Sequence, residues 1–259
     1  WVGRATYGYD DRYLVDVSFG YNGSENFAPG KTRYGFFPSM SLGWVISNEK
    51  FMKNVKFIDH LKIRASAGKV GNDLGTSSRF MYMEGVWNEK GSYYFGVNNS
   101  DGVPRYELGT PGNAGVTWET ALKYNVGLDF EMFKGRLHFS GDIFQENRTG
   151  ILISPNSPPA IIATKLPNMN LGEVLNRGYA LSLGWRDQVG DFHYSIDANM
   201  TFARNKIVYM DEIQTDEPYQ MRTGGSTGRY MLYQFERLYQ ASDFTTDANG
   251  NMILKPELP

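Results

Sequence analysis

The stretch Phe192–Phe202 reads FHYSIDANMTF, and it alternates strictly between two kinds of side chain. Every second position is apolar or small: Phe192, Tyr194, Ile196, Ala198, Met200 and Phe202. The residues between them are all polar. Because successive side chains of a β-strand point to opposite faces, the pattern predicts a strand with one apolar and one polar face. A soluble β-sandwich and a membrane barrel both use strands of this kind.

The alternation recurs along the chain. It is clear in residues 12–20, 121–132, 136–144 and 179–186, and weaker in residues 2–9, 34–45, 61–70 and 229–239. In the clear strands the charged residues all fall on the polar phase, and no segment of comparable length has a convincing helical period. The sequence therefore predicts an all-β fold of about nine strands. A charge-free phase suits lipid, and it also suits the buried side of a soluble sheet.

Composition excludes several classes of function. The 259 residues include no cysteine, so disulfides, thiol catalysis and Cys-ligated zinc are ruled out. The formal net charge is −2 and there is no basic run, which argues against a nucleic-acid partner. The mean hydropathy is −0.44, but alternating strands hide a lipid-facing surface from such averages. The chain starts at Trp1 inside an expected strand, so we expect an internal piece of a longer protein.

The connections between the expected strands distinguish the two architectures. Tight connections at residues 10–11, 133–135 and 187–190 alternate with long ones at residues 21–33, 71–116, 147–177 and 204–228. The connection at residues 46–60 is of medium length where a tight one is expected. Alternate connections of an up-and-down barrel lie on opposite rims. The pattern therefore favours a transmembrane antiparallel β-barrel with short periplasmic turns and long extracellular loops.

The polar phase predicts a hydrated wall facing the lumen of such a barrel. Its candidate residues are Asp129, Glu131, His138, Asp142, His193, Asp197 and Asn199. Glycosidase chemistry would need two of these carboxyls to face each other across a sugar, and a wet polar wall is the simpler interpretation. The histidines lack metal-ligand spacing. We therefore expect no catalytic residue, no metal site and no cofactor.

The long connection at residues 71–116 carries the best candidates for contact with a ligand. They are Trp87, Tyr93, Tyr94 and Tyr106, which are interleaved with Asn, Ser and Gly. Flat aromatic rings offer apolar area to the CH face of a sugar, and neighbouring amides supply hydrogen bonds. The same residues would serve equally as anchors for a docked protein lid. The loop could also simply pack on itself.

A family resemblance appears in the first quarter of the chain. Residues 7–52 carry Arg12-Tyr13, Pro29-Gly30, Phe37-Pro38-Ser39, Gly43-Trp44 and Ile46-Ser47-Asn48-Glu49. In this order and spacing they resemble the barrel region of SusC/RagA-type TonB-dependent outer-membrane transporters. Residues 58–73, 117–137 and 170–185 continue the resemblance, except that Ala180 stands where the family usually has Glu.

The resemblance implies that residues 1–259 form part of a 22-stranded outer-membrane barrel whose plug lies outside this chain. It implies active import of oligosaccharides or peptides, without catalysis. The implied partners are a SusD-like lipoprotein lid, TonB with ExbB and ExbD, and outer-membrane lipid. A passive porin or an outer-membrane adhesin is the alternative interpretation. A soluble β-rich carbohydrate-binding domain is a third.

Overall fold

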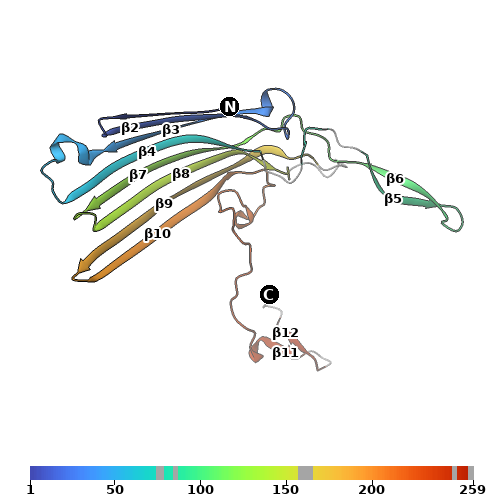
Figure 1. Cartoon of the computed structure of the whole chain (residues 1–259). Coiled ribbons are helices and arrows are strands. Elements are labelled where there is room, and N and C mark those ends of the chain that lie inside the picture. Colours follow the sequence, from blue (N-terminus) through green and yellow to red (C-terminus); the bar gives the residue numbers. More distant parts are fainter. Residues whose placement is uncertain (74–78, 84–86, 157–165, 247–249, 256–259) are drawn as a thin grey trace. The chain divides into compact units, whose positions relative to one another are not determined.

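The computed structural model describes residues 1–73, 79–83, 87–156, 166–246 and 250–255. These residues are mostly β-structure (Figure 1). The strands are β1 Val2–Tyr9, β2 Tyr13–Gly23, β3 Tyr34–Val45, β4 Ile58–Asn72, β5 Trp87–Phe95, β6 Asp101–Leu108, β7 Glu119–Met132, β8 Leu137–Ile153, β9 Met169–Val189, β10 Phe192–Tyr209, β11 Phe244–Thr246 and β12 Met252–Leu254. The described helices are short 3₁₀ turns: η1 Lys31–Arg33, η2 Ile46–Asn48, η3 Lys50–Met52, η4 Pro218–Gln220 and η5 Ala241–Asp243. Among the described residues, no helix has the length and apolar character needed to cross a membrane.

Eight strands form one antiparallel sheet in the order β1-β2-β3-β4-β7-β8-β9-β10 (Figure 1). Each strand pairs with its neighbour in the chain, except that the β5–β6 hairpin is inserted between β4 and β7 and pairs as a sheet of its own. This meander is the connectivity of an up-and-down barrel, whose wall is a single sheet. The chain divides into one compact unit, Trp1–Gly228, and a second unit, Arg229–Pro259, which contains the β11–β12 pair.

The tight connections have the backbone geometry that short hairpins need. Asp10 and Asp11 join β1 to β2 with φ of 53° and 49°, and Phe133 and Lys134 join β7 to β8 with φ of 59° and 61°. Positive φ at successive turn residues matches the right-handed twist of the flanking strands. These turns define what we call the turn end of the sheet, and the opposite end, where the long connections begin, is the loop end.

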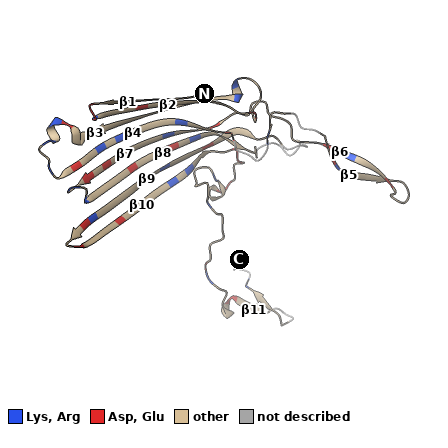
Figure 2. Cartoon of the chain, in the orientation of Figure 1, with Lys and Arg blue, Asp and Glu red and all other residues tan. Residues whose placement is uncertain are grey.

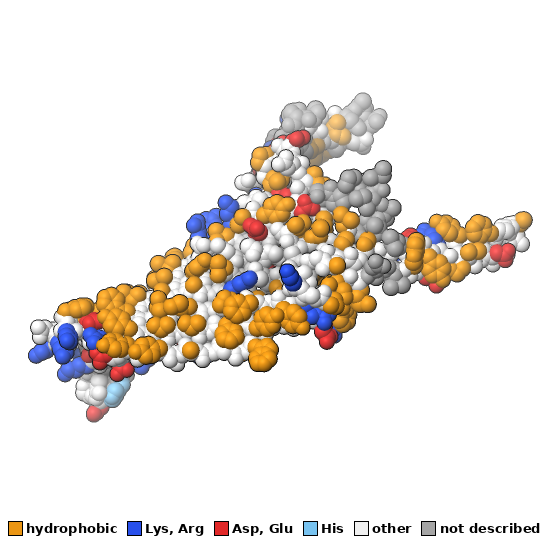
Figure 3. All heavy atoms as spheres, turned by 90° about the horizontal axis from the view of Figure 1, so that it is seen from above, with side chains coloured by type: hydrophobic (Ala, Val, Ile, Leu, Met, Phe, Trp, Pro, Cys, Tyr) orange, Lys and Arg blue, Asp and Glu red, His pale blue; other side chains and the backbone are white. Residues whose placement is uncertain are grey.

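Strand register keeps the two kinds of side chain on separate faces of the whole sheet. Ser18, Ser39 and Gly68 are successive cross-strand partners on the polar face, and Val17, Met40 and Ala67 are partners on the apolar face. The apolar side chains are exposed: Val17 by 45% and Met40 by 45%. Figure 3 shows hydrophobic side chains spread over the face seen there, with a cluster of charged side chains at the left end and further charged side chains toward the right. Within the described residues of Trp1–Gly228, no second sheet packs on this face as it would in a sandwich.

The few fully buried side chains lie at the loop end. Phe27, Val116 and Leu152 form a cluster, with Trp118 packed against it at 5.4 Å between the ring centroids of Phe27 and Trp118. The Trp118 indole N–H donates to the carbonyl of Arg33 at 3.1 Å. We call these four apolar side chains the rim cluster. It ties the connection after β2 to the segment before β7, which are far apart in the sequence.

The structure corrects three expectations about the elements. Residues 229–239 are not a strand: no described strand lies beside them to take up their hydrogen bonds, and Leu232 and Tyr233 on alternate phases are both exposed. The ends of β8, β9 and β10 extend well into the connections expected at 147–177 and 204–228. Alternation fades there because both faces of a strand meet polar surroundings beyond the apolar band. Finally, the β5–β6 hairpin replaces part of an expected loop.

Replacing Phe27 by Ala should loosen the loop end. Phe27 is completely buried, and truncating such a phenylalanine costs about 3–5 kcal/mol. In the full-length protein, hydrogen–deuterium exchange should rise in residues 24–33 and also in residues 113–118. Phe51→Ala is the matched control, since Phe51 is 65% exposed. Faster exchange in residues 24–33 alone would show that the rim cluster does not couple the two segments.

Candidate functional site

All seven predicted wall residues lie on the polar face of the sheet. One row of cross-strand partners contains Asp129, Ser140, Ser182 and Asn199. The next row toward the turn end contains Glu131, His138, Gly184 and Asp197. Asp142 lies one row further toward the loop end, and His193 lies beside the β9–β10 turn. The structure places all seven on one face of the sheet, and their role as a lumen wall stays a prediction.

The structure joins Asp129 and Asp142 through an arginine that the sequence analysis did not single out. The Arg64 guanidinium donates to both oxygens of Asp142 at 2.7 Å, and its Nε donates to Asp129 at 2.8 Å. The Ser140 hydroxyl donates to Asp129 at 2.7 Å. Such charge-assisted and bidentate bonds are the strong ones. We call Arg64, Asp129, Ser140 and Asp142 the arginine clamp, which links β4, β7 and β8.

A glycine makes room for the clamp. Gly127 is the cross-strand partner of both Arg64 and Asp142. A Cβ at position 127 would approach Arg64 Cζ to 2.5 Å, which is closer than real contacts allow. The guanidinium therefore lies across the backbone of β7, and a side chain at position 127 would require it to move. This close approach explains why a glycine interrupts the polar phase of a strand, where it costs stability.

A second glycine, Gly184, leaves space for the pair formed by His138 and Asp197. His138 Nε2 lies 3.2 Å from Asp197 Oδ1, and both side chains lie over Gly184, where a Cβ would collide with each of them. The one hydrogen bond of the His193 imidazole to a described residue is with the carbonyl of Asp191. His138 and His193 are therefore not brought together, and no group of three or more metal-ligating side chains occurs in the described part of the chain.

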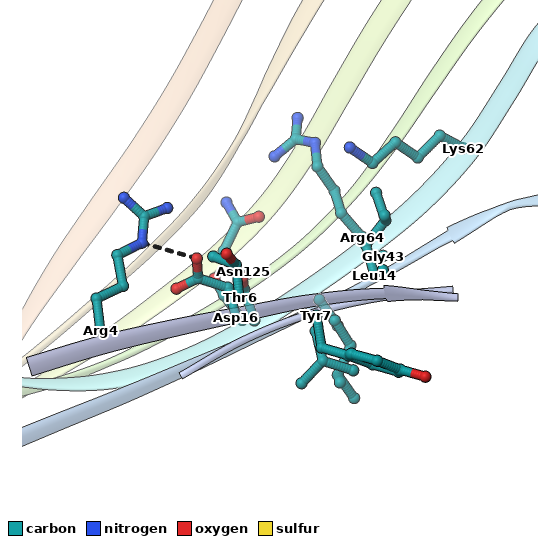
Figure 4. A pocket seen from close by; sticks show the side chains of 15 residues that line it. Arg4, Thr6, Tyr7, Leu14, Asp16, Gly43, Lys62, Arg64 and Asn125 are labelled. Carbon is teal, nitrogen blue, oxygen red and sulfur yellow. Dashed lines mark hydrogen bonds and ion pairs between the residues drawn. The ribbon is translucent and has the colours of Figure 1, made fainter. Parts of the chain in front are cut away.

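The polar face contains a hollow of about 550 Å³ next to the clamp. Its polar lining comes from β1 to β4 and β7: Arg4, Asp16, Ser41, Lys62, Arg64 and Asn125. Figure 4 shows these strands' charged side chains on one side of the sheet and Tyr7 on the other. Arg4 pairs with Asp16 at 2.8 Å. The Lys62 amine has no hydrogen bond or ion pair with any described residue, so it is available to a passing polar group.

The arrangement of Asp129 and Asp142 does not match a glycosidase carboxylate pair. Arg64 occupies the space between the Asp129 and Asp142 carboxylates, so no sugar ring fits between them as that chemistry requires. What remains is a wet surface of paired charges, amides and hydroxyls. Polar groups of this kind exchange hydrogen bonds with water or with a solute that passes along them.

The four aromatic candidates lie on the β5–β6 hairpin. A bulge between Glu89 and Ser92 shifts the register, and as a result Trp87, Tyr94 and Tyr106 share one face of this ribbon. Tyr93 lies on the other face, where the Arg105 guanidinium sits 5.6 Å from its ring centroid. All four rings are more than half exposed. Trp87, Tyr94 and Tyr106 thus form one open aromatic surface, and Tyr93 is exposed on the opposite face.

Four residues of the family motif, Arg12, Tyr13, Trp44 and Glu49, meet at the turn end. Glu49 accepts hydrogen bonds from the Tyr13 hydroxyl at 2.7 Å, the Trp44 indole at 3.0 Å and Arg12 at 3.2 Å. These bonds lower the pKa of the Glu49 carboxyl, with the Tyr13 hydroxyl as the largest cause. The sequence analysis quoted these residues only as a resemblance. Their positions beside the tight connection at residues 10–11 and the medium connection at residues 46–60 were the available signal that they meet.

Comparisons with known proteins agree with this architecture. Residues 2–251 match the family described as "TonB dependent receptor-like, beta-barrel". TonB-dependent receptor P3 of Formosa agariphila is 28% identical over 255 residues, which cover 93% of this chain and 25% of that protein. TonB-dependent receptor SusC of Bacteroides thetaiotaomicron is 28% identical over 265 residues, covering 98% of this chain and 26% of that protein.

Solved structures show the same fold. The RagAB peptide importer in its closed-closed state aligns with a TM-score of 0.74 and 22% sequence identity, covering 100% of this chain and 28% of that chain. In its open-open state the TM-score is 0.67 with 24% identity, over 81% of this chain and 22% of that chain. The chain thus spans about a quarter of the length of the proteins it matches.

Replacing Arg64 by Met should destabilise the sheet by about 1–2 kcal/mol, because it leaves two carboxylates close together without their partner. The cost is moderate because Asp129 and Asp142 keep 30% and 23% of their side-chain exposure. Adding Asp142→Asn should recover part of the loss, as measured by urea unfolding of the full-length protein in detergent. Arg186→Met is the control on the same face. Additive effects of the two changes would contradict the clamp.

Proposed function

The chain belongs to the TonB-dependent receptor-like β-barrel family, and from that membership we propose that it forms part of the wall of an outer-membrane importer. The cargo in this proposal is an oligosaccharide or a peptide, and transport depends on TonB. Residues 1–259 would then all lie in the barrel domain. The observation that carries the proposal is the separation of a polar face from an apolar face over eight strands.

The polar face would serve as the hydrated wall of the lumen. Several of its charges are compensated within the wall, as Arg64 is by two aspartates and Arg4 is by Asp16. A wall of compensated charges offers hydrogen bonds to a polar solute without holding it as a strong single-sign field would. We assign Asp129, Glu131, His138, Asp142, His193, Asp197 and Asn199 to this wall. No covalent chemistry is required of them.

The energy and the lid would come from partners. We propose TonB, with ExbB and ExbD, as the energy source, acting through segments outside this chain. A SusD-like lipoprotein would close the extracellular mouth. Support comes from the likeness to a receptor named SusC and to the RagAB peptide importer. The exposed aromatic rings of Trp87, Tyr94 and Tyr106 would contact either the cargo or this lid.

The import proposal predicts uptake that depends on TonB. Cells that lack the gene for the full-length protein should fail to accumulate fluorescent oligosaccharides, or fluorescent peptides, that complemented cells accumulate. Deleting TonB from the complemented cells should abolish this accumulation, since no energy then reaches the barrel. Uptake that persists without TonB would indicate a passive porin. Surface binding without uptake would indicate an adhesin.

The aromatic face of the β5–β6 hairpin gives a second prediction. Replacing Trp87 and Tyr106 together by Ala should lower cargo capture, or co-purification of the lipoprotein partner, by about tenfold. That loss corresponds to two stacked or buried aromatic contacts. Phe95→Ala is the control, because Phe95 is 58% exposed on the opposite face. Equal behaviour of the control and the double variant would remove this face from both roles.

A further inference from the structure

The apolar face of the sheet carries two arginines where its charge-free band ends. Arg177 on β9 and Arg204 on β10 are direct cross-strand partners, and both side chains are exposed. Like charges opposite each other destabilise a strand pair. Neither guanidinium makes a hydrogen bond or ion pair with any residue that the structure describes. Two adjacent cations without a carboxylate point to an anion from outside the sheet.

The face around the pair offers little negative charge. The partners of Arg177 and Arg204 in the same row are Gln145 on β8 and Tyr124 on β7. Lys206 lies two residues beyond Arg204 on the same face and adds a third positive charge. The nearest carboxylate on this face of β9 is Glu173, four residues away, which is about 13 Å along a strand. Figure 2 shows basic positions of β10 near its loop end.

An apolar hollow adjoins the arginine pair. Its volume is about 530 Å³, and its lining includes Arg177 and Arg204 themselves. The remaining outward side chains that line it are Tyr124, Val126, Ile143, Gln145, Tyr179 and Phe202. The rings of Tyr179 and Phe202 stack at 5.6 Å between centroids and form one wall. Ile143 stays 70% exposed. The site thus combines a cationic edge with apolar walls, as an amphiphile requires.

The height of the pair on the sheet matches a membrane surface. Arg177 and Arg204 lie ten residues along their strands from Asp187 and Tyr194, the partners that close the charge-free band at the turn end. Ten residues at ~3.3 Å each, on strands tilted by about 40°, rise by roughly 25 Å. The outward apolar band of an outer-membrane barrel has the same height. The two guanidiniums therefore lie at the level of lipid headgroups, where the free-energy cost of placing a cation is small.

We propose that Arg177 and Arg204 bind the phosphate of an anionic lipid in the outer leaflet, with an acyl chain of that lipid in the adjoining hollow. The site faces away from the polar wall, so it is separate from the path of any cargo. It depends on the barrel fold and not on the import proposal. Binding would relieve the repulsion between the two guanidiniums and fix the lipid beside β8, β9 and β10.

The test uses the full-length protein in detergent, titrated with 1-palmitoyl-2-oleoyl phosphatidic acid and followed by native mass spectrometry. Replacing both arginines, Arg177→Gln with Arg204→Gln, should weaken binding by about tenfold or more, because two charge-assisted contacts are lost. The control, Lys53→Gln with Arg186→Gln, removes the same charge near the turn end. Each variant is checked for a folded barrel by comparing its electrophoretic mobility, without boiling the sample, with that of the unaltered protein.

Three outcomes would overturn the proposal. The first is equal binding of phosphatidic acid by the double variant and the control variant. The second is equal binding of net-neutral phosphatidylcholine by the unaltered protein, which would mean that the hollow binds acyl chains without the arginines. The third is competition by millimolar inorganic phosphate, which would mean an anion site that ignores the acyl chain. If the unaltered protein binds phosphatidic acid but does not import cargo, only the proposed function is refuted.

Discussion

The unbroken register of the eight-stranded sheet is the constraint on which both faces depend. Side chains alternate with a period of two, so a slip of one residue in any pair would exchange the faces of every strand beyond it. From β1 to β10 the partners stay in phase within the apolar band. The register irregularities of the sheet fall near strand ends, at Ile58/His60, Arg148/Ile151/Leu152 and Ile207/Tyr209. A bulge in mid-strand would have placed charges in the lipid.

The two ends of the sheet are held by different chemistry. At the turn end the stacked rings of Tyr13 and Trp44 present their apolar faces outward, while their polar tips donate to Glu49. Aromatic residues with one apolar and one polar side suit a membrane interface. At the loop end the sheet is held by the rim cluster, whose side chains are buried. The long connections there have enough residues to enclose Phe27 and Val116.

Alternation alone predicted the sheet, its two faces and the placement of its connections, because these depend only on the period of two. It could not predict where β8, β9 and β10 end. Beyond the apolar band both faces are wet, so the pattern stops while the backbone pairing continues. Residues 229–239 show the reverse error: they alternate, yet a strand also requires a neighbour, which the sequence pattern does not supply.

The sequence analysis missed Arg64 for a related reason. Asp129 and Asp142 could be placed on one face, but the clamp needs Arg64 from β4, 65 residues before Asp129. Only the register of β4 with β7 brings Arg64 over Gly127. The available signal was the glycine itself, which interrupts the polar phase of a clear strand. Because Gly127 has no side chain, the Arg64 side chain of the neighbouring strand can lie across its backbone.

The same residue type has opposite surroundings on the two faces. Arg64 on the polar face is surrounded by acceptors and has little capacity left for a solute. Arg177 and Arg204 on the apolar face have none among the described residues. An exposed arginine in water needs no partner, but one at the edge of an apolar band loses part of its hydration and gains from an anion. The headgroup layer of a bilayer is where such anions are fixed in place, which is why unpaired cations on this face point to lipid.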